Sequence, residues 1–150
     1  MIEVKSYIKS KEDYINILEF SGEIKDCNYI EGALELTINN VNLINLEMWD
    51  YIDQLWAYLS EGLDAISKNN EFNTYFPDQP IEVKLKPIKD NVLISVKCNS
   101  KVTTLTNKDE FVSAMSKHAL DFFERLSTIK GIEKDHYKHE IENLKKIHNK

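Results

Sequence analysis

The sequence predicts an α+β domain, in which two amphipathic helices pack on one face of a largely antiparallel sheet and a short C-terminal helix follows. Three observations predict this fold. Short segments alternate apolar and polar residues, as strands half-buried in a sheet do. Two longer segments repeat apolar residues at helical spacing. The segments follow one another as strand-strand-strand-helix, and this order occurs twice.

Three strands are predicted before the first helix. Ile2, Val4 and Ile8 share one face of the first, residues 14–20 form the second, and residues 29–38 alternate most regularly. Gly32 interrupts the apolar row of the third strand, which is typical of a bulge. A helix is predicted from Asn45, a favourable N-cap residue. Its apolar stripe contains both tryptophans, and we expect them in the core: Met48, Trp49, Ile52, Leu55, Trp56, Leu59, Leu63 and Ile66.

The second half repeats the pattern after a rigid, proline-containing turn at residues 75–80. Residues 81–86 and 92–98 predict a hairpin, and residues 102–105 a third strand. A helix is predicted from Asn107, with Glu110 three residues later, and it ends before Gly131. Residues 1–131 thus form a single α+β domain. Residues 132–150 form a charged helical tail that we expect to dock weakly or fray, because its apolar residues are few.

Composition narrows the class of protein. The chain has 150 residues and a net charge of −6, so phosphate backbones repel it and nucleic acid is not the expected partner. The N-terminal residues lack the pattern of a signal peptide, and no apolar stretch is long enough to cross a membrane. Cys27 and Cys98 lack CxxC spacing and are expected to be reduced. These features predict a cytoplasmic protein without a membrane partner.

The motifs of the common catalytic and cofactor-binding sites are missing from the sequence, so we predict no cofactor, metal or catalytic residue. His136, His139 and Glu140 could begin a metal site, but further ligands would have to come from elsewhere. We expect them on a solvated tail. His118 lies at the edge of an apolar stripe and could pair with Cys98. The position of Cys98 on the inward row of its strand favours inert packing instead.

The strongest functional signal is the charge of the first helix. Exposed helices usually mix signs to form favourable pairs four residues apart, whereas this one places acidic residues on its polar face and no lysine before Lys68. Two tyrosines border the same face. Carboxylates steer a basic partner, and tyrosines give it rigid contact area. We predict a partner-binding surface made of Asp50, Tyr51, Asp53, Tyr58, Glu61 and Asp64.

The hairpin has the opposite sign, because Lys84, Lys86 and Lys97 occupy its outward row. A basic sheet face can follow single-stranded nucleic acid when aromatic residues alternate with the lysines for base stacking. Here the outward positions hold Leu93 and Ser95. The hairpin therefore does not favour nucleic-acid binding.

Two segments carry a resemblance to a known group of proteins. The chain resembles small bacterial immunity proteins encoded beside polymorphic toxins in two segments that a lone helix follows. These segments are WDYIDQLWAYLSEG at residues 49–62 and YFPDQPIEVKLKP at residues 75–87. The resemblance covers roughly residues 30 to 130 and has no diagnostic motif. It implies an acidic, single-domain, cytosolic inhibitor. It assigns no functional residue.

Together these observations predict a non-enzymatic domain that binds another protein, in the form of a toxin-neutralising immunity protein that blocks a basic toxin domain sterically and electrostatically. Two alternatives stay open. One is a small-molecule-binding protein or enzyme, with His118 and the tyrosines lining a pocket between sheet and helices. The other is a structural module, in which a homo-oligomer forms through the unusually placed apolar residues Leu93 and Leu120.

Overall fold

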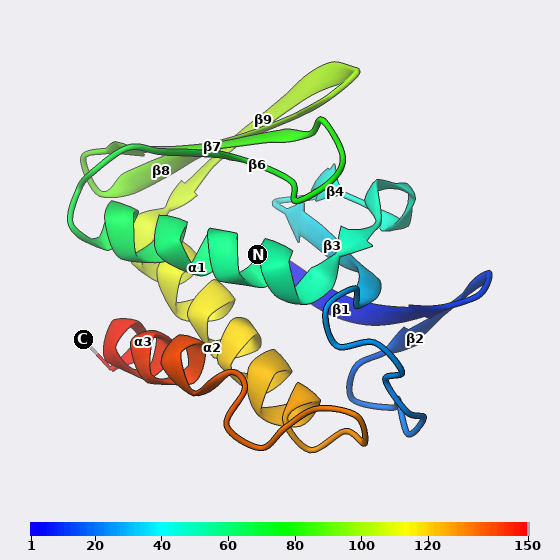
Figure 1. Ribbon diagram of the computed structural model, residues 1–150. Helices are drawn as coiled ribbons and strands as arrows, with labels where there is room; N and C mark the ends of the chain where they lie inside the picture. The colour runs from blue at the N-terminus through cyan, green and yellow to red at the C-terminus, as the bar shows by residue number, and fades with distance from the viewer. Residues whose placement is uncertain (150) are drawn as a thin grey trace.

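The computed structural model describes residues 1–149, which form two antiparallel sheets and three α-helices (Figure 1). The first sheet has the order β2-β1-β3-β4, and a short strand β5 also pairs with β3. Its strands are β1 (Ile2–Ser10), β2 (Asp13–Asn16), β3 (Glu31–Ile38), β4 (Val41–Ile44) and β5 (Asp50–Tyr51). Ser6 and Ile8 of β1 and Leu34 and Leu36 of β3 are buried, so these alternate positions give the sheet an inner face.

The second sheet is a meander of four strands in the order β6-β7-β8-β9. Its strands are β6 (Phe72–Tyr75), β7 (Glu82–Ile88), β8 (Asn91–Cys98) and β9 (Ser100–Asn107). Tight turns connect the last three, with Lys89 (φ 55°) and Asn99 (φ 65°) in the left-handed region. Val83, Leu85, Ile94 and Val96 face inward and are buried.

Two α-helices cover the inner faces of the sheets, and a third packs on these two. The helix α1 (Ile52–Ser67) contacts β3, β6 and β7, and α2 (Lys108–Leu126) contacts β1, β8 and β9. Asn107 caps α2 as predicted, since its side chain accepts a hydrogen bond from the Glu110 amide at 2.9 Å. The third helix, α3 (Lys138–His148), packs on α1 and α2 on the side away from the second sheet (Figure 1).

These elements confirm the predicted α+β class, its antiparallel strands and its two amphipathic helices. The strands divide between two sheets, which the alternation pattern did not indicate. β4, β5 and β6 were not predicted, so the order strand-strand-strand-helix does not occur twice, and the strand predicted at residues 14–20 ends at Asn16. The space between the sheets and the helices is filled by aliphatic and aromatic side chains. The cavity left there measures only about 10 Å³, which is at the lower limit for one water molecule. No helix within residues 1–149 is long and apolar enough to cross a membrane.

The start of the first helix differs from the prediction. Asn45 caps a short 3₁₀ helix, η1 (Leu46–Met48), by accepting a hydrogen bond from the Glu47 amide at 2.9 Å. The chain then becomes extended through β5, and α1 begins only at Ile52. Trp56 lies on α1 and is completely buried, as predicted. Trp49 precedes the helix and is only half-buried, so its predicted place in the core was wrong.

The C-terminal tail also packs more firmly than predicted. Tyr137, Leu144 and Ile147 are 4%, 0% and 6% exposed, and they belong to the same hydrophobic cluster as the residues of both sheets. His148 Nδ1 lies 3.2 Å from the hydroxyl of Ser116 on α2. The expectation of weak docking was therefore wrong, because a few well-placed apolar residues are sufficient when a complementary helix pair already exists.

Candidate functional site

The six residues predicted as a partner-binding surface do not share one exposed face. Asp50 and Asp53 are buried, at 2% and 7% exposure. Tyr51, Tyr58 and Asp64 are half-buried, and Glu61 is exposed. The prediction that all six project from one solvated helix face was wrong, because Asp50 and Tyr51 lie in β5 and Asp53 faces the C-terminal segment. A role of the remaining residues in partner binding stays a prediction.

Asp50 fixes the strand β5 to the loop at residues 76–80. Its carboxylate accepts hydrogen bonds from three backbone amides: Tyr51 at 2.7 Å, Asp78 at 3.1 Å and Gln79 at 2.9 Å. The Gln79 side-chain amide donates in turn to the carbonyl oxygen of Trp49. Hydrogen bonds to a charged group are stronger than neutral ones. Asp50 therefore holds the Tyr51 backbone directly, and it holds the Trp49 backbone indirectly through Gln79.

Asp53 joins the first turn of α1 to the C-terminal segment. The Tyr137 hydroxyl donates to Asp53 Oδ2 at 2.7 Å in a buried environment, and Asp53 Oδ1 has no hydrogen-bond partner among the described residues. Burial raises the pKa of Asp53, although the bond from Tyr137 acts in the opposite direction. Burial, followed by the Asp53 charge, raises the pKa of Tyr137. Asp53 is thus a connection within the fold.

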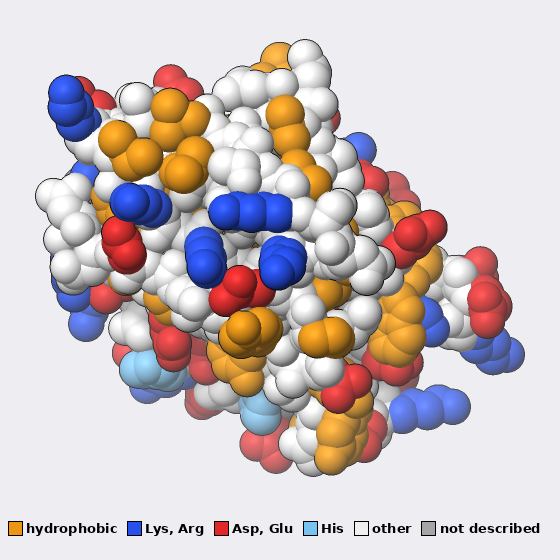
Figure 2. All heavy atoms as spheres, turned by 90° about the horizontal axis from the view of Figure 1, so that it is seen from above, with side chains coloured by type: hydrophobic (Ala, Val, Ile, Leu, Met, Phe, Trp, Pro, Cys, Tyr) orange, Lys and Arg blue, Asp and Glu red, His pale blue; other side chains and the backbone are white. Residues whose placement is uncertain are grey.

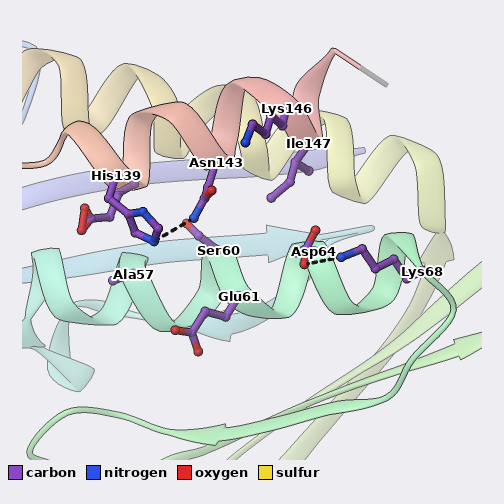
Figure 3. A pocket seen from close by; sticks show the side chains of 10 residues that line it. Ala57, Ser60, Glu61, Asp64, Lys68, His139, Asn143, Lys146 and Ile147 are labelled. Atoms are coloured by element: carbon purple, nitrogen blue, oxygen red, sulfur yellow. Dashed lines mark hydrogen bonds and ion pairs between the residues drawn. The ribbon is translucent and has the colours of Figure 1, made fainter.

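Glu61 and Asp64 line a groove between α1 and α3, shown in Figure 3. The groove has a volume of about 440 Å³. Asp64 forms an ion pair with Lys68 at 3.1 Å, and His139 on the opposite helix is hydrogen-bonded to Asn143 at 3.1 Å. Its other lining residues include Glu140 and Lys146, so the charges in it are mixed. The groove therefore does not indicate whether a ligand would be anionic or cationic.

A group of aromatic rings lies on the outer face of the first sheet. Directly paired residues of antiparallel strands point to the same side, and the register pairs Tyr7 with Ala33, Lys9 with Tyr14 and Glu31 with Tyr51. All of these residues therefore face away from the helices. Trp49 belongs to the same side, because the Lys9 ammonium lies 4.6 Å from the centre of its ring.

Tyr29 extends this surface at its edge. Its ring packs edge-on against Tyr51 with centroids 5.5 Å apart, and the side chain is 61% exposed. We call the resulting surface the aromatic face, which consists of Tyr7, Tyr14, Tyr29, Trp49 and Tyr51. It holds four of the seven tyrosines and one of the two tryptophans in the chain, a concentration that the folded core does not require.

Carboxylates surround the aromatic face. Partial burial and then the Glu35 charge raise the pKa of Tyr7. The pKa of Tyr14 is raised by partial burial and by the charges of Glu12 and Glu31. The pKa of Tyr51 is raised by partial burial and by the charges of Asp78 and Glu31. Tyr7, Tyr14 and Tyr51 therefore stay neutral at physiological pH and keep their hydroxyl groups as hydrogen-bond donors. The surface combines flat apolar rings with carboxylates and with two lysines of β1, since Lys5 pairs with Glu35 and Lys9 lies over the Trp49 ring.

His118 takes part in a buried polar network. The Trp56 indole donates to the Ser6 hydroxyl at 2.9 Å, and Ser6 Oγ lies 2.8 Å from His118 Nε2. This resembles a serine–histidine pair, but Ser6 is completely buried, so its hydroxyl is not exposed to solvent. Burial lowers the pKa of His118 to about 4, so its ring is neutral at pH 7. The network links the first sheet to α1 and α2.

The remaining candidates from the sequence are scattered. His136 and His139 are exposed, and no group of three or more metal-ligating side chains converges within residues 1–149. Cys27 and Cys98 are unpaired and half-buried. Leu93 lies on the outer face of the second sheet, whereas Leu120 packs partly against the core, so the two do not form a common apolar patch.

Comparisons of this chain with known proteins found no matching family model, no matching curated protein and no matching solved structure. Sequence reasoning did not connect Tyr7 and Tyr29 with Tyr51, because it placed Tyr51 on a helix. The signal that could have done so is the alternation of residues 49–51, in which Trp49 and Tyr51 flank Asp50 as they would in a strand.

Proposed function

We propose that this protein is a non-enzymatic binding domain that holds another protein on its aromatic face. The observation that supports the proposal is the collection of five aromatic side chains on the open side of the first sheet, away from the core. Tyrosine and tryptophan are enriched in protein interfaces, where they bury much area at a small entropic cost. A sheet also presents them rigidly, because each ring stands on a paired strand.

The partner we propose is a basic protein. The carboxylates of Glu12, Glu31, Glu35 and Asp78 lie close enough to the tyrosines to affect their titration, and the chain carries a net charge of −6. Charges at the rim of an interface accelerate association and exclude partners of like charge. The rings would supply affinity and the carboxylates would orient the encounter.

The resemblance to immunity proteins suggests which basic protein this is. We infer that the aromatic face covers the active-site cleft of a toxin domain and excludes its substrate. Asp50 would act indirectly in this role, as a positioning residue that holds Tyr51 through its backbone amide and Trp49 through Gln79. Such a function requires no reacting group on this chain, and the cytoplasm is the compartment where it would act.

The test combines a growth assay with an affinity measurement. Bacteria would co-express this protein with the toxin domain encoded beside its gene, and biolayer interferometry would measure binding of the two purified proteins. Tyr29→Ala combined with Tyr51→Ala should abolish protection, because truncation of an aromatic anchor costs about 2 kcal/mol, or about 30-fold in affinity, per residue. Tyr75→Ala is the matched control, since Tyr75 is 57% exposed but lies on the second sheet.

Equal protection by the double variant and the control would place the interface elsewhere. If the wild-type protein failed to bind the toxin domain at all, the immunity role would be wrong. Circular dichroism of each variant would show whether it is folded, and Tyr29 is exposed enough for its truncation to leave the fold intact.

A further inference from the structure

The outer face of the second sheet is a second open surface with a different chemistry. The register arranges its side chains in rows that cross the strands: Tyr75, Glu82, Lys97 and Lys101 form the first row, and Asn73, Lys84, Ser95 and Thr103 the second. The next row contains Lys86, Leu93 and Leu105. Figure 2 looks onto this side of the molecule and shows basic side chains gathered around an acidic one, with hydrophobic side chains nearby.

Three lysines on this face surround a small hollow, which we call the lysine hollow. It has a volume of about 130 Å³, enough for a carboxylate group, and is lined by Glu82, Lys84, Ser95, Lys97 and Lys101. Lys84 forms a long ion pair with Glu82 at 3.9 Å. Neither Lys97 nor Lys101 forms an ion pair with another described residue. The hollow therefore has an excess of positive charge.

The arrangement of these lysines is unfavourable for the isolated chain. Lys97 and Lys101 are direct partners across β8 and β9, and like charges at directly opposite positions destabilise a sheet. Glu82, which pairs with Lys97 from β7, offsets part of this repulsion. A negatively charged group between the two would remove this repulsion. The floor of the hollow offers it hydrogen bonds, because Ser95 is 7% exposed and its hydroxyl lies 3.2 Å from that of Thr103.

Apolar side chains beside the hollow indicate which kind of anion fits. Ile88 and Leu105 are 40% and 46% exposed, and Leu93 is paired with Leu105 on the same face. Single-stranded nucleic acid would require several aromatic rings among the lysines for base stacking. The row of Lys97 and Lys101 holds one exposed ring, Tyr75, and the other apolar neighbours are aliphatic. Aliphatic groups next to lysines complement a protein segment that alternates acidic and apolar side chains.

We propose that this face binds an acidic segment of a partner protein. Its carboxylates enter the lysine hollow, and its apolar side chains cover Leu93 and Leu105. The surface lies on a different sheet from the aromatic face, so the proposal does not depend on the identity of the partner bound there. The protein would then present an acidic aromatic surface and a basic aliphatic surface on its two sheets.

The experiment uses fluorescence anisotropy with the full chain at low ionic strength. The three labelled probes are a peptide of repeated Glu-Glu-Leu units, polyglutamate and an oligothymidylate. We expect the order of affinity to be acidic-apolar peptide, then polyglutamate, then oligothymidylate. Lys97→Glu combined with Lys101→Glu should weaken binding of the peptide about tenfold or more, and added salt should do the same. Leu105→Ser should weaken binding of the acidic-apolar peptide and leave binding of polyglutamate unchanged.

The matched control is Lys25→Glu combined with Lys134→Glu, two exposed lysines outside both sheets that give the same change in net charge. An equal loss of affinity in this control would show that only net charge matters and would overturn the proposal. Tighter binding of the oligothymidylate than of the peptide would assign the face to nucleic acid instead. Absence of binding by all three probes would also refute it.

Discussion

His118 should make the stability of this protein fall below neutral pH. Burial lowers its pKa from the ordinary value of 6.5 to about 4. Between these two values the unfolded chain binds a proton at this residue and the folded protein does not, so acid favours unfolding across that range. A difference of this size corresponds to about 3 kcal/mol of unfolding free energy lost between pH 7 and pH 4. His118 Nε2 also lies 2.8 Å from the Ser6 hydroxyl, so protonation of the ring would change a buried hydrogen bond.

The assay is urea unfolding at pH 7, 6, 5 and 4, comparing the wild-type protein with His118→Gln. Glutamine is neutral throughout this range. Between pH 7 and pH 4 the unfolding free energy of the variant should therefore fall by about 3 kcal/mol less than that of the wild type, and this difference does not depend on the stability of the variant at pH 7. Other titrating groups are common to both proteins and cancel in the difference. His139→Gln is the control, because His139 is exposed, and it should follow the wild type. Parallel pH profiles for wild type and His118→Gln would refute the buried neutral imidazole.

Two further predictions concern the buried carboxylates. Asp53→Asn should keep or increase the stability at pH 7, because burial raises the pKa of Asp53 and its charge therefore costs stability above that pKa. Tyr137→Phe should instead lose about 1–3 kcal/mol of unfolding free energy, because the Asp53 carboxylate loses its hydrogen-bond donor. Chemical denaturation of both variants decides this, and a large loss in Asp53→Asn would contradict it. Asp50→Ala should lose about 3 kcal/mol or more of unfolding free energy, because three backbone amides lose their acceptor. Asp78→Ala should change the stability little, because Asp78 is exposed in the loop that Asp50 holds. Equal denaturation midpoints for these two variants would rule out the anchoring role of Asp50.

Where local signals were strong, the sequence was sufficient to predict the fold. The hairpin of β7 and β8 followed from strict alternation, and the start of α2 followed from Asn107 and Glu110. The separation into two sheets depends on pairings between distant segments, such as β1 with β3, which alternation does not specify. The strand β6 is short and holds one inward aromatic residue, Phe72, so its pattern resembles a loop.

The tail shows a second limit of reasoning from pattern. Residues 132–150 are strongly charged, and their few apolar residues predict a marginal helix. The structure buries Tyr137, Leu144 and Ile147 against a surface that α1 and α2 form together. The stability of a short helix depends on the complementary surface, which is a property of the tertiary structure and is not encoded in the segment itself.

The partner surface was misplaced for a single geometric reason, the residue at which α1 begins. On a helix that starts at Asn45, residues 49–51 advance by about 100° each, which places Trp49 inside and Asp50 outside. In the structure these residues are extended until Ile52, and extended residues alternate sides. Trp49 and Tyr51 therefore point away from the core while Asp50 points into it. The acidic residue becomes the internal anchor and the tryptophan becomes part of the surface, so a shift of the helix start moves the proposed binding surface from α1 to the first sheet.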